Sequence, residues 1–162
     1  MVSFSTIFSA SAALVTVTAA TPKCSGGNTA CFSSYPGFGQ NLTDTRHFSQ
    51  AVRIGRYVQL AGQNGWDSSG NIPSNFTTQV ENMYTNIDTA LKVAGSRGLQ
   101  DVISIRTFIV GTGADFLARA AEHSRVRELR MPGQLPTSTS VGITALVLAG
   151  TLIEVEAEAW IE

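Results

Sequence analysis

The chain has 162 residues, of which 43% are hydrophobic and 14% are charged, and its formal net charge at pH 7 is −1. This length is typical of one domain with its own hydrophobic core. The charge balance argues against a nucleic-acid binder that relies on a basic surface, because such binding is driven by neutralising phosphates and releasing their counterions.

Residues 1–20 are apolar, small and rich in hydroxyls, and the first charged side chain is Lys23. Their apolar part is too short to span a bilayer as a helix, which takes roughly 20 apolar residues. We interpret them as a signal peptide, because residues 17–19 or 18–20 offer the small side chains of a cleavage site, although no Lys or Arg precedes them. We therefore expect a secreted protein, with a cytoplasmic location as the alternative.

Residues 21–45 are dense in Gly, Ser, Asn, Pro and Thr and show no apolar period, which predicts a flexible arm. Both cysteines, Cys24 and Cys31, lie here, and they can close a small disulfide loop in an oxidising compartment. No further Cys or His stands at ligand spacing, so we expect no zinc site. N-glycosylation sequons begin at Asn41 and Asn75.

The folded domain is expected over residues 46–162. The predicted elements are strands at 48–54 and 57–61, a helix between Asn75 and Gly95, a strand at 102–110, a weaker helix at 114–129, and strands at 137–146 and 152–161. This order favours an α+β fold in which two helices pack on one face of a mixed sheet. The two histidines, His47 and His123, are expected at the surface or at a hinge.

The last strand alternates between an apolar face and an acidic face. Ile153, Val155, Ala157, Ala159 and Ile161 point one way, and Leu152, Glu154, Glu156, Glu158 and Trp160 point the other. The acidic face is either a solvated outer surface or, at its inner end, part of a pocket lined by Glu154. The uncovered sheet face is partly apolar, which favours self-association.

Five stretches carry a resemblance to a known family: FSQAVRIGRYVQLAGQ, ENMYTNIDTALKVAG, DVISIRTFIV, LPTSTSVGI and LIEVEAEAW. In order and spacing the chain resembles the YjgF-type Rid family of reactive intermediate deaminases over residues 46–162. The resemblance implies a YjgF/chorismate-mutase-like fold, a homotrimer with clefts between subunits, and hydrolysis of reactive imines and enamines to ketoacids and ammonia. Family members are also described as L-PSP endoribonucleases, an activity that the charge balance does not support.

The resemblance also implies functional residues. In the family, a glutamate on the last strand positions water and matches Glu154, and an arginine after the proline loop binds the substrate carboxylate. The arginine's place falls at Ser138 when counted from Pro136, or at Thr139 when counted back from Glu154, and neither residue is basic. Ser140 stands where many members carry Cys or Thr. These changes indicate a remodelled site for a less charged ligand.

Arg106 is the substitute that the sequence offers for the missing arginine. If its strand face is the one that carries Glu154, Arg106 either neutralises the acidic row or acts as an anion clamp opposite Glu154. We therefore expect an enzyme that deaminates or tautomerises a small imine, enamine or enol-type intermediate in an inter-subunit cleft. The catalytic candidates are Glu154 and Arg106, and the substrate-binding candidates are Phe48, Gln63, Ser138, Thr139 and Ser140.

The alternative function is a non-catalytic trimer that binds a small molecule or acts as an interaction module. No cofactor, nucleic-acid partner or membrane partner is expected.

Overall fold

The computed structural model describes residues 23–24 and 30–162, so the predicted signal peptide at residues 1–20 lies outside the described residues. The helices are α1 (Phe38–Arg46), α2 (Phe76–Val93) and α3 (Gly113–Arg130), with a 3-10 turn η1 at Leu99–Asp101. The strands are β1 (Lys23–Cys24), β2 (Ala30–Ser33), β3 (Ala51–Ile54), β4 (Tyr57–Leu60), β5 (Gln63–Asn64), β6 (Val102–Val110), β7 (Thr137–Ile143) and β8 (Ile153–Trp160).

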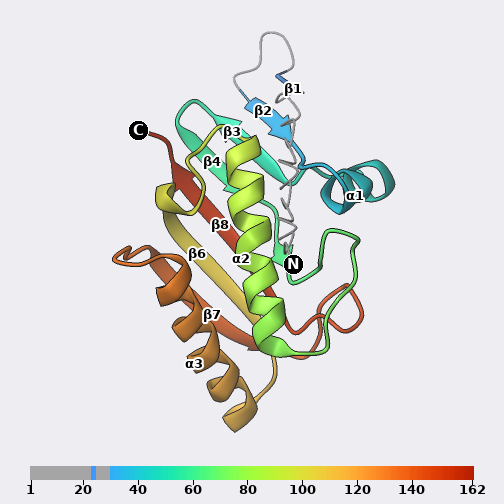
Figure 1. Ribbon diagram of the computed structural model, residues 1–162, viewed down its shortest axis with the longest axis vertical. Helices are drawn as coiled ribbons and strands as arrows, with labels where there is room; N and C mark the ends of the chain where they lie inside the picture. The colour runs from blue at the N-terminus through green and yellow to red at the C-terminus, as the bar shows by residue number, and fades with distance from the viewer. Residues whose placement is uncertain (1–22, 25–29) are drawn as a thin grey trace, which may run out of the picture.

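All strands belong to one mixed sheet in the order β1-β2-β3-β4-β8-β6-β7, with β5 paired to β8 beyond the end of β4. The pairs are antiparallel except β6 with β7, which are parallel and joined through the crossover helix α3. Helices α2 and α3 cover one face of the sheet, and α1 lies to one side (Figure 1). The predicted α+β architecture is confirmed, and the structure adds the third helix, α1.

Helix α2 is the main support of the sheet. Asn75 caps its first turn by accepting a hydrogen bond from the backbone N–H of Thr78, and the chain leaves the helix through Gly95 at φ +92°. Its buried stripe packs against β8, whose four alternating apolar side chains are almost fully buried. Burying each large aliphatic side chain stabilises the fold by roughly 1.5–3 kcal/mol. The buried members of the stripe are Val80, Met83, Tyr84, Ile87 and Leu91.

The segment that we expected to be a flexible arm is folded from Ala30 onward. Strand β2 pairs with β3, and α1 packs into the core through Leu42, which is 6% exposed. The sequence pattern missed both elements because a four-residue strand and a helix with one buried aliphatic side chain show no apolar period. The strand predicted from residue 48 begins only at Ala51.

The two cysteines lie opposite each other on neighbouring strands. The register pairs Cys24 with Cys31, and Cys31 is disulfide-bonded. Disulfides form and persist in oxidising compartments and are rare in the cytosol. Within the described part of the chain, no helix is both long and apolar enough to cross a bilayer.

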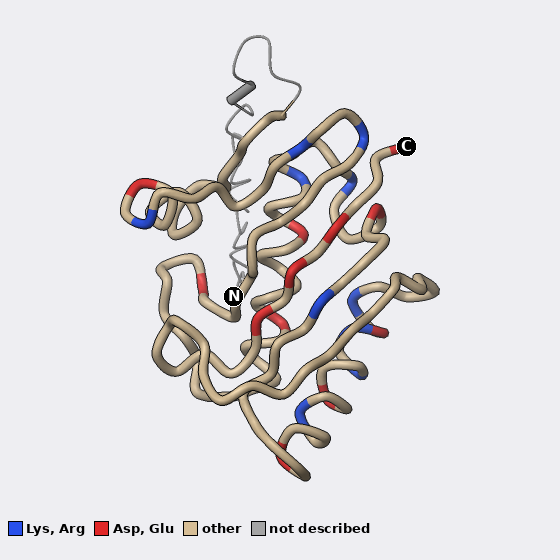
Figure 2. The backbone as a smooth tube through the Cα atoms, turned by 180° about the vertical axis from the view of Figure 1, so that it is seen from behind, with Lys and Arg blue, Asp and Glu red and all other residues tan. Residues whose placement is uncertain are grey.

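The sheet face opposite α2 and α3 is open. Figure 2 shows this face, with acidic positions following one strand across its centre and a basic position on the neighbouring strand. The register identifies them as Glu154, Glu156 and Glu158 on β8 and Arg106 on β6. Trp160 ends the row and is 47% exposed. The predicted separation of β8 into an apolar face and an acidic face is confirmed.

His123 is a core residue and not the surface or hinge residue that we expected. It lies on α3 with 1% exposure, its Nε2 is 2.9 Å from the hydroxyl oxygen of Tyr84 on α2, and the two rings are stacked. Burial disfavours the imidazolium and lowers the pKa of His123 to about 4, and the positive charge of Arg127 acts in the same direction. The neutral ring therefore joins the two helices.

This burial predicts how stability depends on pH. The unfolded chain protonates His123 near pH 6.5 but the folded chain only near pH 4, so acidification favours the unfolded state between these values. The free energy of unfolding should fall by about 1.4 kcal/mol per pH unit within this window. Urea unfolding at several pH values compares the wild type with His123→Gln, whose side-chain amide can hydrogen-bond but cannot titrate. The free energy of unfolding should depend on pH more steeply in the wild type. Equal slopes above about pH 5, where carboxylates contribute little, would contradict the prediction.

Candidate functional site

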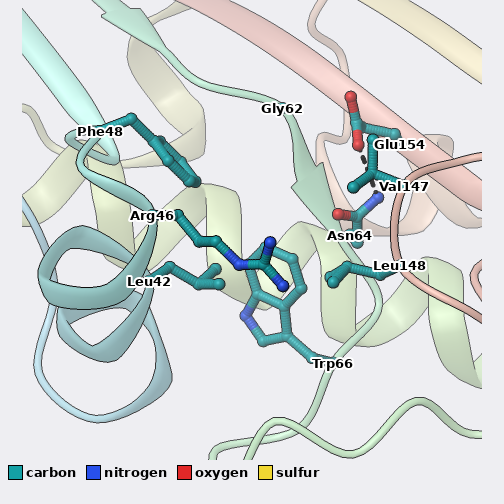
Figure 3. A pocket seen from close by; sticks show the side chains of 9 residues that line it. All are labelled: Leu42, Arg46, Phe48, Gly62, Asn64, Trp66, Val147, Leu148 and Glu154. Carbon is teal, nitrogen blue, oxygen red and sulfur yellow. Dashed lines mark hydrogen bonds between the residues drawn. The ribbon is translucent and has the colours of Figure 1, made fainter.

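A pocket opens beside Glu154, between α1, the segment that follows β4, and the loop that joins β7 to β8 (Figure 3). Its volume is about 280 Å³. Ligand sites in proteins commonly measure about 300–1,000 Å³, so this pocket suits a small molecule. Most of its wall is apolar, with three polar or charged side chains. The lining residues are Leu42, Arg46, Phe48, Gly62, Asn64, Trp66, Val147, Leu148 and Glu154.

The Glu154 carboxylate is held on one side only. Asn64 Nδ2 donates a hydrogen bond to Glu154 Oε2 at 3.0 Å and a second one to the carbonyl of Ile153 at 3.2 Å. The other oxygen, Oε1, has no hydrogen bond to any described residue and lies over Gly62. A Cβ atom at position 62 would collide with Oε1, so glycine makes room for the carboxylate. The result is an oriented carboxylate with one oxygen free to accept a proton or bind water.

An extra residue in the strand beside β8 decides which side chains reach this carboxylate. Gln59 pairs with Glu158 and Gln63 pairs with Val155, so four steps along one strand match three steps along the other. This shift is a β-bulge at residues 61–62, and it reverses which face the following side chains occupy. Asn64 therefore joins Glu154 on the open face, and Gln63 turns into the core.

Gln63, which we predicted to bind substrate, is completely buried and does not line the pocket. Its amide donates to Gln50 Oε1 at 2.9 Å and to the carbonyl of Ala61 at 3.0 Å, and its Oε1 accepts from the Tyr35 hydroxyl at 3.1 Å. Trp66 Nε1 donates to the same hydroxyl at 2.9 Å. Gln63 thus holds the backbone of the bulge directly and the Trp66 side chain through Tyr35. It supports the pocket from the core side of the sheet.

Two residues on the opposite wall follow directly from helix α1. Arg46 is the last residue of α1, and Phe48 follows it two positions later at 40% exposure. Between them His47 has φ +59° and ψ +39°, the only positive φ of a non-glycine residue in the described chain. Phe48 was predicted from the sequence and does line the pocket. Arg46, Asn64 and Trp66 were missed, and only Asn64 had a signal, since it directly follows Gln63.

The three hydroxyl residues of β7 do not meet Glu154 within one protomer. Strand β6 lies between β7 and β8, which sets them roughly 10 Å apart. Thr139 shares the open face with Arg106, whereas Ser138 and Ser140 point toward the α3 side. The Ser138 hydroxyl accepts a hydrogen bond from Arg127 at 3.0 Å. All three are exposed on the edge strand, and none of them lines the pocket.

Arg106 shares a sheet face with Glu154, as the alternation suggested, but its partners are the two glutamates farther along. Its Nε is 3.0 Å from Glu156 Oε2, and its Nη2 is 3.3 Å from Glu158 Oε1. The cross-strand neighbour of Glu154 is Phe108. Arg106 is therefore engaged in neutralising the acidic row and does not line the Glu154 pocket.

The chemistry of the pocket follows from its donors. Among the described residues there is no group of three or more His, Cys, Asp or Glu side chains able to hold a metal ion. The reactive groups are one carboxylate with a free oxygen, one amide that orients it, and one guanidinium at the opposite wall. A carboxylate in this position can accept a proton from a bound water or ligand.

The chain matches a protein-family model and several solved structures. The family model described as Endoribonuclease L-PSP matches residues 38–161. A member of the YjgF/YER057c/UK114 family from Mycobacterium tuberculosis is 26% identical with a TM-score of 0.67, over 82% of this chain and 99% of that one. RidA from the Antarctic bacterium Psychrobacter sp. is 27% identical with a TM-score of 0.64, over 70% and 88%. No curated protein matches the chain.

The buried position of Gln63 predicts a structural effect of its substitution. Gln63→Leu removes the donor to the buried Gln50 Oε1 and the acceptor of the Tyr35 hydroxyl, which keeps only the hydrogen bond that it accepts from Trp66. The free energy of unfolding should therefore fall by about 1–3 kcal/mol. Ser140→Ala on the exposed strand β7 is the control and should change it by less than about 0.5 kcal/mol. Chemical denaturation measures both. Unchanged stability of Gln63→Leu would mean that the side chain is not part of the support.

Proposed function

The chain belongs to the Endoribonuclease L-PSP family, the group of the YjgF and RidA proteins, and from this membership we propose that it is an enzyme for small reactive intermediates. Its substrate is an imine, enamine or enol-type compound, which it deaminates by hydrolysis or converts to a tautomer. The observation that carries the proposal is the Glu154 carboxylate, oriented by Asn64 in a small apolar pocket with Oε1 free.

Glu154 supplies the proton transfers that both reactions need. In imine hydrolysis, Oε1 accepts a proton from water while the water oxygen bonds to the imine carbon, and the nitrogen takes up a proton. The carbon–nitrogen bond of the resulting carbinolamine then breaks, releasing ammonia and a carbonyl product. In tautomerisation the same oxygen moves a proton between carbon and heteroatom. A fixed carboxylate within hydrogen-bond reach of the reacting proton suits either step.

Arg106 has a supporting role in this proposal. Two carboxylates already engage its guanidinium, and it stands beside residues 156 and 158, away from the pocket wall. Three glutamates on one strand face repel one another, and a cation between two of them offsets that repulsion. We therefore favour the charge-neutralising interpretation of Arg106 over the anion clamp.

We further propose that the protein is a homotrimer that assembles through its open sheet face. This face carries apolar side chains that a monomer seldom leaves bare, among them Val141 at 41% and Trp160 at 47% exposure. Assembly brings the exposed edge strand β7 of one subunit toward the pocket of another, where Thr139, the β7 hydroxyl residue on the open face, contacts the ligand.

The same reasoning leads us to propose a secreted protein. The disulfide at Cys31 suits an oxidising compartment, and residues 1–20 have the composition of a signal peptide. In that setting the substrate comes from outside the cytoplasm.

The first test replaces the carboxylate. Glu154→Gln keeps the size and the hydrogen bond from Asn64 but cannot accept a proton, so kcat/KM should fall by about 10²–10⁴-fold. Imines are generated from several amino acids with an amino-acid oxidase, and ketoacid release is followed with and without the protein. Glu158→Gln, a glutamate on the same strand outside the pocket, should keep its activity. If the wild type binds ligand but accelerates no substrate, the protein is the non-catalytic binding module.

The second test concerns assembly. Light scattering on the purified protein should give about three protomer masses. Val141→Asp places a charge on the open face and should shift the mass toward one protomer, because burying an unpaired charge is costly. Leu117→Asp, on the exposed side of α3 at 66% exposure, should remain trimeric. A wild-type protein with the mass of one protomer would rule out the trimer.

A further inference from the structure

Arg46 differs from every other arginine of the chain. The nine arginines all lie in the described part of the structure, and eight of them have a hydrogen bond or an ion pair there. Arg46 has neither to any described residue. Its nearest acidic residue in sequence, Asp44, accepts a hydrogen bond from Gln40 instead. A guanidinium offers five donors, and at Arg46 no residue that the structure describes accepts from any of them.

The backbone directs this free guanidinium at the pocket. Leu42 and Arg46 are four residues apart on α1, so they lie on the same side of the helix. Leu42 is buried and lines the pocket, and this brings Arg46 to the pocket rim, where it is exposed. Figure 3 shows the Arg46 side chain extending toward the middle of the pocket. The left-handed turn at His47 ends the helix immediately after Arg46.

The pocket therefore has two opposite charges that do not pair. Glu154 and Asn64 stand on the wall opposite Arg46 (Figure 3), and Glu154 takes its hydrogen bond from the amide. The space between them is bounded by Phe48, Trp66 and Leu148. A ligand that fits has an anionic end for the guanidinium, an apolar body, and a reactive centre near the free oxygen of Glu154.

We propose that Arg46 binds the carboxylate of a small acid with an apolar side chain, and so selects the substrate of this pocket. The proposal rests on the proposed function, since it names the substrate class of the same site. The residues at 138–140 carry no positive charge, and the Ser138 hydroxyl already accepts from Arg127. Arg46 supplies the guanidinium from another element, and a guanidinium binds a planar carboxylate through two parallel hydrogen bonds. This substrate class differs from the less charged ligand that positions 138–140 led us to expect.

Binding of a stable probe tests this inference without turnover. The probe is 4-methyl-2-oxopentanoate, a branched 2-oxo acid, and its uncharged partner is the corresponding amide. Calorimetric titration at pH 7 should show the wild type preferring the acid over the amide by at least about tenfold. Arg46→Ala and Arg46→Gln should lose this preference, and Arg46→Lys should retain part of it. Arg125→Ala, which removes a paired arginine on α3, is the matched control and should bind like the wild type.

The outcomes separate the inference from the proposed function. Equal wild-type affinity for acid and amide, no binding of either, or an acid preference that survives in folded Arg46→Ala and Arg46→Gln would overturn the role of Arg46. Loss of the preference in Arg106→Ala instead would assign the anion site to that residue. If Arg46→Ala loses the preference but the wild type accelerates no imine, the carboxylate site stands and the enzymatic proposal fails. If the wild type turns over imines and Arg46→Ala leaves KM unchanged, the enzyme stands and the Arg46 site fails.

Discussion

The register of β8 is the constraint on which the rest of the structure depends. Four apolar side chains of this strand, at alternate positions 153–159, are almost fully buried on the face that α2 covers. A slip of one residue in the register would bury the glutamates in place of these side chains. The cost of burying unpaired carboxylates is far larger than the stabilisation gained from the aliphatic residues. The register is therefore fixed by the core, and it forces Glu154, Glu156 and Glu158 onto the open face.

The three glutamates have different roles because different residues lie beside them on the neighbouring strands. Glu156 and Glu158 lie beside β6, where Arg106 pairs with both. Glu154 has Phe108 on one side and the bulge with Asn64 on the other, so an amide and not a cation meets it. An amide orients a carboxylate without neutralising it. The reactivity that we propose for Glu154 thus comes from its place at the inner end of the row.

Helix α1 closes the site and supplies its positive charge. It is held by Leu42 in the core and by the hydrogen bond between the hydroxyls of Thr43 and Ser34. Ser34 directly follows β2, which pairs with β3 and carries the disulfide at Cys31. These contacts place Arg46 at the rim, facing a wall that other elements build. A guanidinium contributed by α1 does not depend on the residue type at positions 138–140 of β7. The site can therefore combine the fold of its family with a rearranged set of polar groups.

The sequence alone determined the α+β class, the span of α2 and the two faces of β8. The spacing of apolar residues along each segment shows directly which face is buried and whether the segment is a helix or a strand. It also indicated Glu154 and Phe48, which line the pocket. Only the tertiary structure showed that Asn64 and not Gln63 lines the pocket. One extra residue at 61–62 reverses the strand faces, and the sequence pattern gives no sign of it. It likewise decided the partners of Arg106 and the position of Arg46, because these depend on which elements meet in space and not on the residues beside them in the chain.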